Sequence, residues 1–418
     1  MVNHSVSLNN KIKKTFILIV IVFFFWGFSH GLLDVLNKHF QDSLDIDKAH
    51  SALLQLAYYG AYVFVAIPTG KLMERYGFKS SILTGLSFFA FGSLLFVPAT
   101  LANTFLSFLI AIFILAMGLG CLETGANSYA ASIGSEDETA KRLNLAQTFN
   151  GVGLLLGPVV GGSIFFIPSI SIGSVDLNPV MLTYVSMAVI VIIFLSYLYF
   201  SKLYEPSTKE SHNEVNSPCR YPVGKASDLW RLPSFTSALL CVWLQVGALV
   251  GIGAFFINFA IENVDVTAKT ASMLLSVGLF LFMAGRVVSL IALKYIEANK
   301  LLFTYSMMAA LACVVILCDI RYVSIVGVYV CYYCMSIQYP SIFAAALSGL
   351  GEFKKIATSY LVLGISGGAI YPYLMGMIAD ITGKTAYSFI LPMFSYIVIS
   401  LYAYTKMNIK KSNNGNIV

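Results

Sequence analysis

Long apolar runs separated by short polar segments dominate the pattern along the chain. A membrane-spanning helix needs about 20 consecutive apolar residues, and the sequence contains twelve runs of about this length. They cover residues 15–36, 51–73, 79–99, 104–132, 142–168, 179–201, 233–260, 268–292, 300–318, 322–349, 355–380 and 386–405. The pattern therefore predicts an all-α integral membrane protein with twelve transmembrane helices, preceded by a loose polar and basic tail at residues 1–14.

The composition favours a membrane protein over a large soluble domain. Of the 418 residues, 58% are hydrophobic and 11% are charged, whereas soluble domains contain about 25% charged residues. The first apolar run is too long for a cleavable signal peptide, so we expect it to be retained as the first helix. The lipid bilayer is thus the expected surrounding of nearly the whole chain.

The positive charge follows the expected membrane topology. If both termini lie inside, most of the 26 Lys and Arg residues fall in the inner segments. Cytoplasmic segments carry such an excess, so the distribution predicts that both termini are cytoplasmic. The net charge of +6 is therefore no sign of a nucleic-acid partner.

The longest hydrophilic break lies between the sixth and seventh runs and suggests two halves. We predict an N-terminal six-helix bundle at residues 1–201, a cytoplasmic loop at 202–231 and a C-terminal six-helix bundle at 232–418. Glycine and proline recur in the fifth run and again in the eleventh. Matched, interrupted helices of this kind are typical of transporters built from two pseudo-symmetric repeats, although small residues also simply permit close helix packing.

Two acidic residues, Asp34 and Glu123, lie inside apolar runs. An acid within the bilayer costs at least about 2.5–3.5 kcal/mol on insertion scales, which makes it a functional hypothesis by default. A carboxyl group held away from water favours its neutral form and can therefore bind and release a proton. The alternative is that neighbouring amides merely satisfy both groups.

His30 lies one helical turn before Asp34, so the two side chains share a helix face. It could share a proton with Asp34, donate a hydrogen bond to a ligand, or be a packed polar group. Histidine titrates in the physiological range, which suits the first role.

Amides and aromatic residues inside the runs are candidate substrate contacts. A neutral polyhydroxylated ligand needs neutral donors and acceptors together with an apolar wall. Trp26 is the candidate wall, although packing or anchoring at the membrane interface explains it equally well. The amides and hydroxyls could instead join helices to one another, at about 0.6 kcal/mol per bond. The candidates are Gln55, Tyr59, Asn127, Gln147, Asn150 and Gln338.

No motif for covalent catalysis, nucleotide binding or zinc binding is present in the sequence. Cys331 and Cys334 have the spacing of a redox or zinc pair, but they lie in an apolar run without a second pair, which favours packing. We therefore expect a protein that is not an enzyme and uses no cofactor or metal. The missing phosphate-binding loop favours transport driven by an ion gradient.

The loop from Gly70 to Lys79 reads G-x-L-x-E-R-x-G-x-K, which is typical of the major facilitator superfamily. Glu74 and Arg75 would lie at the inner ends of helices, where a charge network can stabilise one conformation. We therefore predict a conformational latch at Gly70, Glu74, Arg75 and Gly77. The alternative is a solvated basic turn.

Four further segments make the resemblance narrower. They read FFFWGFSHGLLDVLNKHFQ, LETGAN, RLNLAQTFNGVG and MSIQYPSIF, and together they resemble the fucose and glucose/galactose proton-symporter family. The resemblance implies the major facilitator fold and proton-coupled symport of a neutral monosaccharide in the bacterial inner membrane by a monomeric, multi-pass protein. It also implies that Asp34 and Glu123 are the essential carboxylates.

The chain departs from this family at several expected sugar contacts. The family usually has asparagines shortly before the first acid, where this chain has His30, Gly31 and Leu33. In the seventh run Gln245 stands where the family has tyrosine, and Leu249 stands where it has glutamine. The particular substrate therefore stays open. A uniporter or exporter of another small polar metabolite, such as a polyol or amino sugar, is the alternative, and the two acids favour proton coupling over a uniporter.

Overall fold

The computed structural model describes residues 2–133, 139–172, 175–204, 226–347, 350, 357, 360–361 and 363–415. Two compact units make up the chain. The first contains Met1–Ile46 and Leu53–Thr208, and the second contains Asp47–Ala52 and Lys209–Val418. The short segment Asp47–Ala52 thus belongs to the second unit, although the chain on both sides of it belongs to the first.

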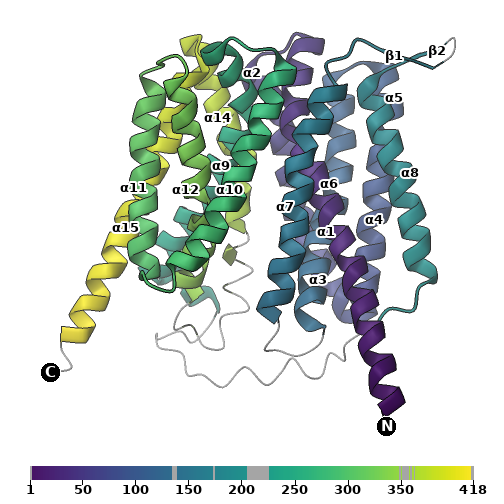
Figure 1. The fold of residues 1–418 in the computed structure, drawn as a ribbon, viewed down its shortest axis with the longest axis horizontal. Helices are drawn as coiled ribbons and strands as arrows, with labels where there is room; N and C mark the ends of the chain where they lie inside the picture. Colours follow the sequence, from purple (N-terminus) through teal and green to yellow (C-terminus); the bar gives the residue numbers. More distant parts are fainter. Residues whose placement is uncertain are drawn as a thin grey trace. The chain divides into compact units, whose positions relative to one another are not determined.

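Helices make up almost all of the first unit (Figure 1). They are α1 (Val2–Leu44), α3 (Leu53–Tyr76), α4 (Phe78–Leu94), α5 (Phe96–Ala102), α6 (Phe105–Ser132), α7 (Thr139–Ile164) and α8 (Pro179–Phe200). Between α7 and α8 the chain forms an antiparallel hairpin of β1 (Ile170–Ile172) and β2 (Val175–Leu177), in which Ile170 is paired with Leu177. This hairpin is the one departure from the predicted all-α fold among the described residues.

The second unit is helical throughout its described residues. Its long helices are α9 (Pro233–Val264), α10 (Ala268–Ala292), α11 (Ala298–Leu317), α12 (Val323–Leu347), α14 (Gly367–Thr382) and α15 (Ile390–Gly415). Shorter pieces are α2 (Lys48–Ser51) and the 3-10 turns η3 (Ala226–Arg231), η5 (Gly364–Ser366) and η6 (Thr385–Phe389).

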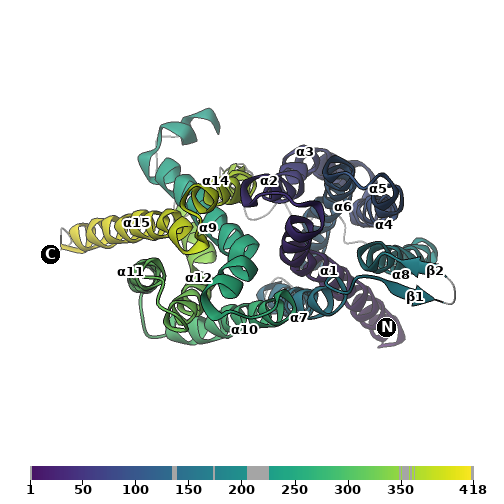
Figure 2. The same cartoon turned by 90° about the horizontal axis from the view of Figure 1, so that it is seen from above.

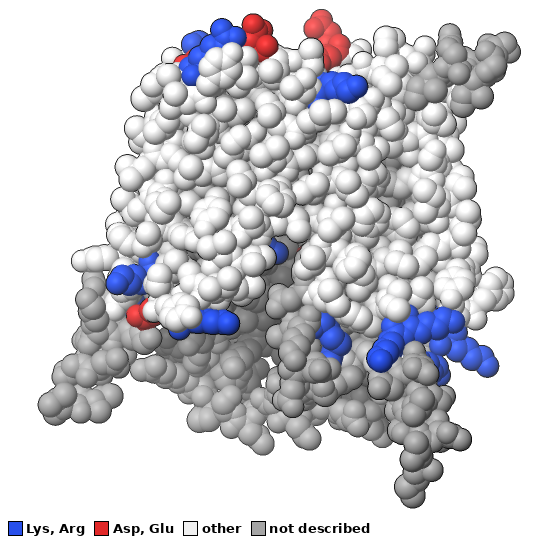
Figure 3. Space-filling model, in the orientation of Figure 1, with Lys and Arg blue, Asp and Glu red and all other residues white. Residues whose placement is uncertain are grey.

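Nine helices in the described part of the chain are long and apolar enough to cross a membrane. The predicted all-helical membrane architecture is thus confirmed, whereas the count of twelve spans stays a prediction. On the face drawn in Figure 3, the described charged side chains gather at the two ends of the helices, and the wide band between them is almost free of charge. This distribution is the one expected of a chain surrounded by lipid.

Two predicted helix boundaries are wrong. The tail predicted as loose belongs to α1, which begins at Val2. No glycine or proline occurs before Gly27 to interrupt that helix. The run at 79–99 is divided at Leu95 into α4 and α5, because Pro98 has no N–H group to donate to the carbonyl of Leu94.

Glycine sets the contact between α1 and α7, which lie side by side in Figure 2. A Cβ atom built on Gly31 would lie 2.3 Å from the carbonyl oxygen of Leu154, and one built on Gly157 would lie 2.5 Å from the Cα atom of Gly31. Neither distance leaves room for a methyl group, so small residues permit the two backbones to touch. The contact fixes the rotation of α1 and leaves another of its faces to pack against α3.

The second unit repeats this arrangement with α9 and α14. A Cβ atom on Gly367 would lie 2.1 Å from the carbonyl oxygen of Trp243, and one on Gly247 would lie 2.6 Å from the ring of Tyr371. The hydroxyl groups of Tyr371 and Ser395 are 2.7 Å apart, which joins α14 to α15. Close helix contact at glycine therefore organises both units.

The segment Asp47–Ala52 is bound at the end of α14. The Asp380 carboxylate accepts hydrogen bonds from the backbone nitrogens of Lys48 (3.2 Å) and Ala49 (2.8 Å). These N–H groups open the short helix α2 and have no partner within it. Lys48 Nζ also binds Glu262 Oε1 at 2.8 Å, so carboxylates on two helices of the second unit hold the segment.

Candidate functional site

Three tyrosines on one side of α3 form a cluster in the first unit. The rings of Tyr58, Tyr59 and Tyr62, here called the tyrosine cluster, have centroids 5.1 to 6.3 Å apart. Positions three and four apart share a helix face, which brings Tyr62 onto the same side as the adjacent pair. The cluster supplies hydroxyl groups and aromatic rings at one place.

Two side chains of α1 bind this cluster. His30 Nε2 lies 2.6 Å from the hydroxyl oxygen of Tyr59, and Trp26 Nε1 donates to the hydroxyl of Tyr62 at 3.2 Å. The two residues are one turn apart on α1, and their partners are three apart on α3, so both bonds cross the same helix contact. The structure thereby brings together Trp26, His30 and Tyr59, which were predicted separately.

Asp34 continues the same face of α1 one turn after His30. Its side chain is buried, with the residue 8% exposed, and Gln55 of α3 faces its carboxyl group. Gln55 is itself fully buried. The hydrogen bond of His30 goes to Tyr59 and not to Asp34, so proton sharing between His30 and Asp34 stays a prediction.

Glu123 reaches the tyrosine cluster from α6. Gly120, one turn earlier, lies against Tyr62, because a Cβ atom there would be 3.4 Å from its ring. Tyr62 of the cluster therefore lies beside the turn of α6 that carries Glu123. The two acids thus lie on helices that both pack against one cluster of neutral hydroxyl groups.

The amides of α6 and α7 form a neighbouring contact. Gln147 Nε2 donates to Asn127 Oδ1 at 3.3 Å, and both side chains are half-buried. Asn150 Nδ2 donates to the backbone carbonyl of Phe23 at 3.2 Å, which ties α7 to α1. Asn150 thus has a structural partner, whereas Gln147 and Asn127 have each other.

Two buried glutamines lie in the second unit. Gln338 of α12 is fully buried, and its Nε2 donates to Ser306 Oγ at 3.4 Å. Gln245 of α9 is 1% exposed, and neither of its amide atoms has a hydrogen-bond partner in the described part of the chain. Gln245 was not among the predicted site residues, although its replacement of a family tyrosine was a signal that could have included it.

The predicted latch lies between α3 and α4. Gly77 has φ of 81°, a conformation that favours glycine, and it begins α4. The guanidinium of Arg75 lies 5.3 Å from the centroid of the Tyr76 ring, and a Cβ atom on Gly70 would meet nothing within 4 Å. The side chain of Glu74 lies outside the described residues, so its pairing stays a prediction.

Sequence reasoning missed two residues of these sites. Lys79 donates to the backbone oxygens of Tyr199 (2.9 Å) and Ser201 (2.8 Å), and so binds the end of α8. Carbonyl groups at helix ends have no partner within the helix, which is why a nearby lysine binds there. Tyr58 is the central member of the tyrosine cluster, and its adjacency to Tyr59 in the sequence was the available signal.

Comparison with known proteins identifies relatives over nearly the whole chain. The Major Facilitator Superfamily model matches residues 15–372. The L-fucose-proton symporter of Escherichia coli is 30% identical over 403 residues, covering 93% of this chain and 92% of that protein. A glucose/galactose transporter of Brucella abortus is 29% identical over 392 residues, covering 92% of each.

Solved structures give the same result. FucP, a Major Facilitator Superfamily transporter in the outward conformation, matches with a TM-score of 0.67 and 28% identity, over 94% of this chain and 99% of that one. The xylose transporter XylE of E. coli matches with a TM-score of 0.71 at 12% identity, over 94% of this chain and 99% of that one, a likeness of fold alone.

Proposed function

The chain belongs to the Major Facilitator Superfamily, and from this premise we propose that it is a proton-coupled symporter of a neutral monosaccharide. The observation that carries the proposal is the position of Asp34 and Glu123 on α1 and α6, the two helices that pack against the tyrosine cluster of α3. The similarity to a named L-fucose-proton symporter and a named glucose/galactose transporter supports the same reaction. Alternating access between two units is the usual transport mechanism of proteins built from such repeats.

Asp34 is the proposed proton carrier. It is buried among neutral groups, with Gln55 facing its carboxyl, and no Lys or Arg side chain forms an ion pair with it among the described residues. An acid in these surroundings can be neutralised only by a proton, so a change in its surroundings during transport changes its proton occupancy. Glu123 is half-buried and is proposed to respond to the substrate directly.

The proposed substrate contacts are neutral. Gln147, Asn127 and the tyrosine hydroxyls supply donors and acceptors, and Trp26 beside Tyr62 supplies a flat apolar surface. Gln338 is the proposed contribution of the second unit. Amides and aromatic rings together suit a sugar, whereas a phosphate or carboxylate substrate needs a cationic group.

The proposed orientation places both termini in the cytoplasm, on the basis of the basic residues in the inner segments. The bacterial inner membrane is the proposed location, in keeping with the bacterial relatives. The loop with Gly70, Glu74, Arg75 and Gly77 is proposed to stabilise one of the transport conformations. The protein is proposed to act as a monomer.

Uptake into proteoliposomes tests the function. The purified protein is reconstituted, and labelled L-fucose, D-galactose, D-glucose, a polyol and an amino sugar are offered with and without an inward proton gradient. We expect at least one neutral sugar to accumulate above its external concentration only when the gradient is present. Equilibration without accumulation would indicate a uniporter, and preference for a sugar phosphate would overturn the proposed substrate class.

A further inference from the structure

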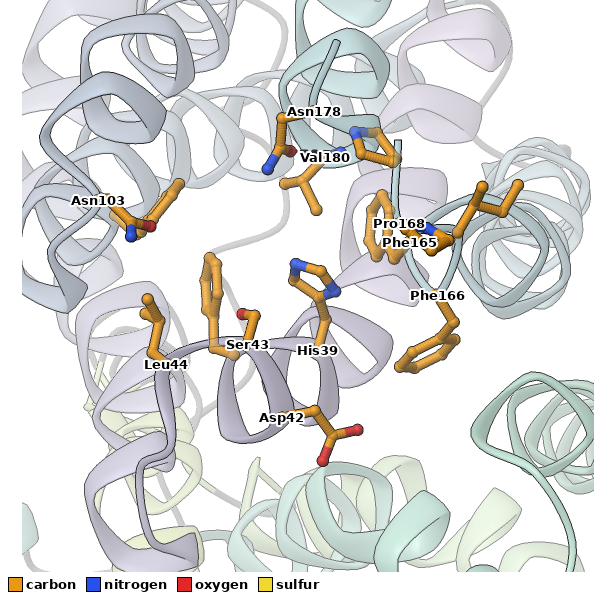
Figure 4. Close-up of a pocket in the computed structure, with 14 residues that line it drawn as sticks. His39, Asp42, Ser43, Leu44, Asn103, Phe165, Phe166, Pro168, Asn178 and Val180 are labelled. Atoms are coloured by element: carbon orange, nitrogen blue, oxygen red, sulfur yellow. Dashed lines mark hydrogen bonds between the residues drawn. The ribbon is translucent and has the colours of Figure 1, made fainter. Parts of the chain in front are cut away.

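A cavity of about 350 Å³ lies in the first unit, at the far end of α1 from the N-terminus (Figure 4). It is here called the outer cavity and is lined by the ends of α1, α7 and α8 together with residues near α5 and α6. His39 of its wall comes five residues after Asp34, or about 7.5 Å further along the helix. The outer cavity is therefore separate from the tyrosine cluster and from the predicted substrate contacts.

Aromatic rings form much of the wall of the outer cavity. Phe40, Phe108, Phe165 and Phe166 all line it. The ring of His39 stands between them, with centroids 6.0 Å from Phe165 and 6.3 Å from Phe166. Such rings offer flat apolar surfaces against which the C–H face of a small ligand can pack.

Polar side chains point into the space between the rings. Figure 4 shows the ring of His39 and the side chain of Asn178 directed into the cavity from opposite sides. Asn178 Oδ1 is already used, because it accepts hydrogen bonds from Val180 N (2.9 Å) and Met181 N (3.1 Å) at the start of α8. The amide nitrogen of Asn178 is the part of the group that can donate to a ligand.

The one acid among the described residues of the cavity wall is neutralised. Asp42 binds Lys38 Nζ at 2.6 Å and lies at the exposed rim. The side chains directed into the cavity are an imidazole and an amide, which can exchange hydrogen bonds with a neutral ligand. A volume of about 350 Å³ lies at the small end of the range for ligand pockets, which is about 300–1,000 Å³.

At the corresponding end of α9 in the second unit, polar side chains bind other residues of the chain. Glu262 accepts hydrogen bonds from Thr385 N (2.7 Å) and Thr385 Oγ1 (2.8 Å), and it binds Lys48 at 2.8 Å. Asn263 next to it donates to Asp319, whose carboxylate also binds Lys384. In the first unit the same position along the first helix borders a cavity with polar groups directed into it.

We propose that the outer cavity is a second binding site for a neutral polyhydroxylated solute, of the same class as the transported sugar. The inference rests on the proposed function for the identity of the ligand. His39 and Asn178 supply the hydrogen bonds, and Phe40 and Phe165 supply the apolar walls. Under the proposed orientation the site lies at the outer end of the unit and binds sugar before it reaches the tyrosine cluster.

Equilibrium dialysis with labelled L-fucose, D-galactose and D-glucose tests the site. The expected stoichiometry is two sugars per chain in the wild-type protein and one in His39→Leu, with the thermal midpoint of the variant unchanged. Asp42→Asn at the rim is the matched control and keeps both sites. A single site in the wild-type protein, or two sites in His39→Leu, overturns the inference.

A second measurement does not depend on His39. Ser43, at the exposed rim, is replaced by Cys and labelled with a maleimide, with the wild-type protein as the background control because Cys318 is also exposed. The bound sugar is expected to slow the labelling at least threefold, and an unchanged rate contradicts the site. If the protein shows proton-driven uptake but binds one sugar per chain, the outer site is refuted and the symport is not. If it binds two sugars per chain but shows no proton-driven uptake, the symport is refuted and the outer site is not.

Discussion

The two units share a framework but differ in chemistry. The carbonyl of Phe24 lies against Gly153 in the first unit, as that of Trp243 lies against Gly367 in the second. When the sequences of α1 and α9 are aligned at these two contacts, Trp26, His30 and Asp34 correspond in position to Gln245, Leu249 and Gly253. The titratable face of α1 thus has no titratable counterpart in α9.

Under the proposed function, this difference assigns proton coupling to the first unit. The first unit combines the buried Asp34 and the half-buried Glu123 with the tyrosine cluster, which suits proton binding. Two acids of the second unit, Glu262 and Asp380, lie at helix ends and bind backbone or side-chain donors there. A carboxylate at a helix end with such donors stabilises structure and has no need to change its protonation. We therefore expect substitutions of acids to act on coupling in one unit and on stability in the other.

The largest effect is expected for Asp34→Asn. The amide keeps the size of the carboxyl but cannot carry a proton, so accumulation driven by a proton gradient should fall to the level of protein-free liposomes. Gradient-driven uptake and the thermal midpoint are to be measured together, because the variant should fold normally. Accumulation at the wild-type level would remove Asp34 from the coupling role.

Asp380→Asn is the matched substitution in the second unit. It weakens two hydrogen bonds to the backbone of Asp47–Ala52, and loss of such a helix-terminal partner costs about 1 kcal/mol. We expect a lower thermal midpoint but retained proton-driven accumulation. Loss of coupling with unchanged stability would end the proposed division between the units.

Glycine substitutions probe the close helix contacts of the two units. In Gly31→Ala the new methyl would lie 2.3 Å from a backbone oxygen, which cannot move independently of α7, whereas in Gly251→Ala the nearest atom is Met375 Sδ at 2.4 Å on a flexible side chain. Overpacking of this kind costs about 1–3 kcal/mol, and we expect the larger loss of folded protein for Gly31→Ala. Gly60→Ala, where a Cβ atom meets nothing within 4 Å, is the control. Detergent-extracted yield and thermal midpoint report the outcome, and equal losses at Gly31 and Gly251 would contradict it.

Glu123→Gln is expected to have a smaller effect than Asp34→Asn. Glutamine resembles the protonated acid and keeps its hydrogen-bonding capacity, so exchange of labelled for unlabelled sugar should persist. Sugar binding measured from pH 5 to 9 should become independent of pH. A pH profile that still matches that of the wild type would show that another group titrates.

The smallest effect is expected for Tyr59→Phe. It removes the hydroxyl that binds His30 at 2.6 Å and leaves the ring contact in place. Such bonds between helices are worth about 0.6 kcal/mol, which corresponds to an affinity change of roughly threefold. The apparent affinity for sugar is the quantity to measure, with Tyr76→Phe at the exposed end of α3 as the control. A loss of proton coupling in Tyr59→Phe would instead join His30 to the proton path.

The sequence was sufficient to locate the long apolar helices and the two acids within them, because an acid in a long apolar run is visible without any structure. The number of spans and the roles of the acids stay predictions. It predicted the polar residues of α1 and α3 one by one but not their partners. Those depend on how each helix is rotated, and the rotation of α1 follows from the contact of Gly31 with Gly157, more than a hundred residues away in the chain.

Features that depend on tertiary structure could not be predicted. The outer cavity needs the ends of several helices to come together, and the binding of Asp380 to Lys48 joins residues 332 positions apart. The break at Leu95 was predictable in principle from Pro98, although a continuous apolar run concealed it. Two predictions stay open: the pairing of Glu74, and the proton sharing of His30 with Asp34. Both depend on side-chain positions or charge states, which the hydrophobic pattern of a sequence does not determine.

Proton movement during sugar entry is the direct test of proton coupling through Asp34. A sugar identified by the uptake panel is added to lightly buffered proteoliposomes containing the wild-type protein, Asp34→Asn or Asp380→Asn, and the external pH is recorded. We expect alkalinisation with the wild-type protein and with Asp380→Asn, and none with Asp34→Asn. Sugar entry without any pH change in the wild-type protein, or alkalinisation that persists in Asp34→Asn, would contradict proton coupling through Asp34.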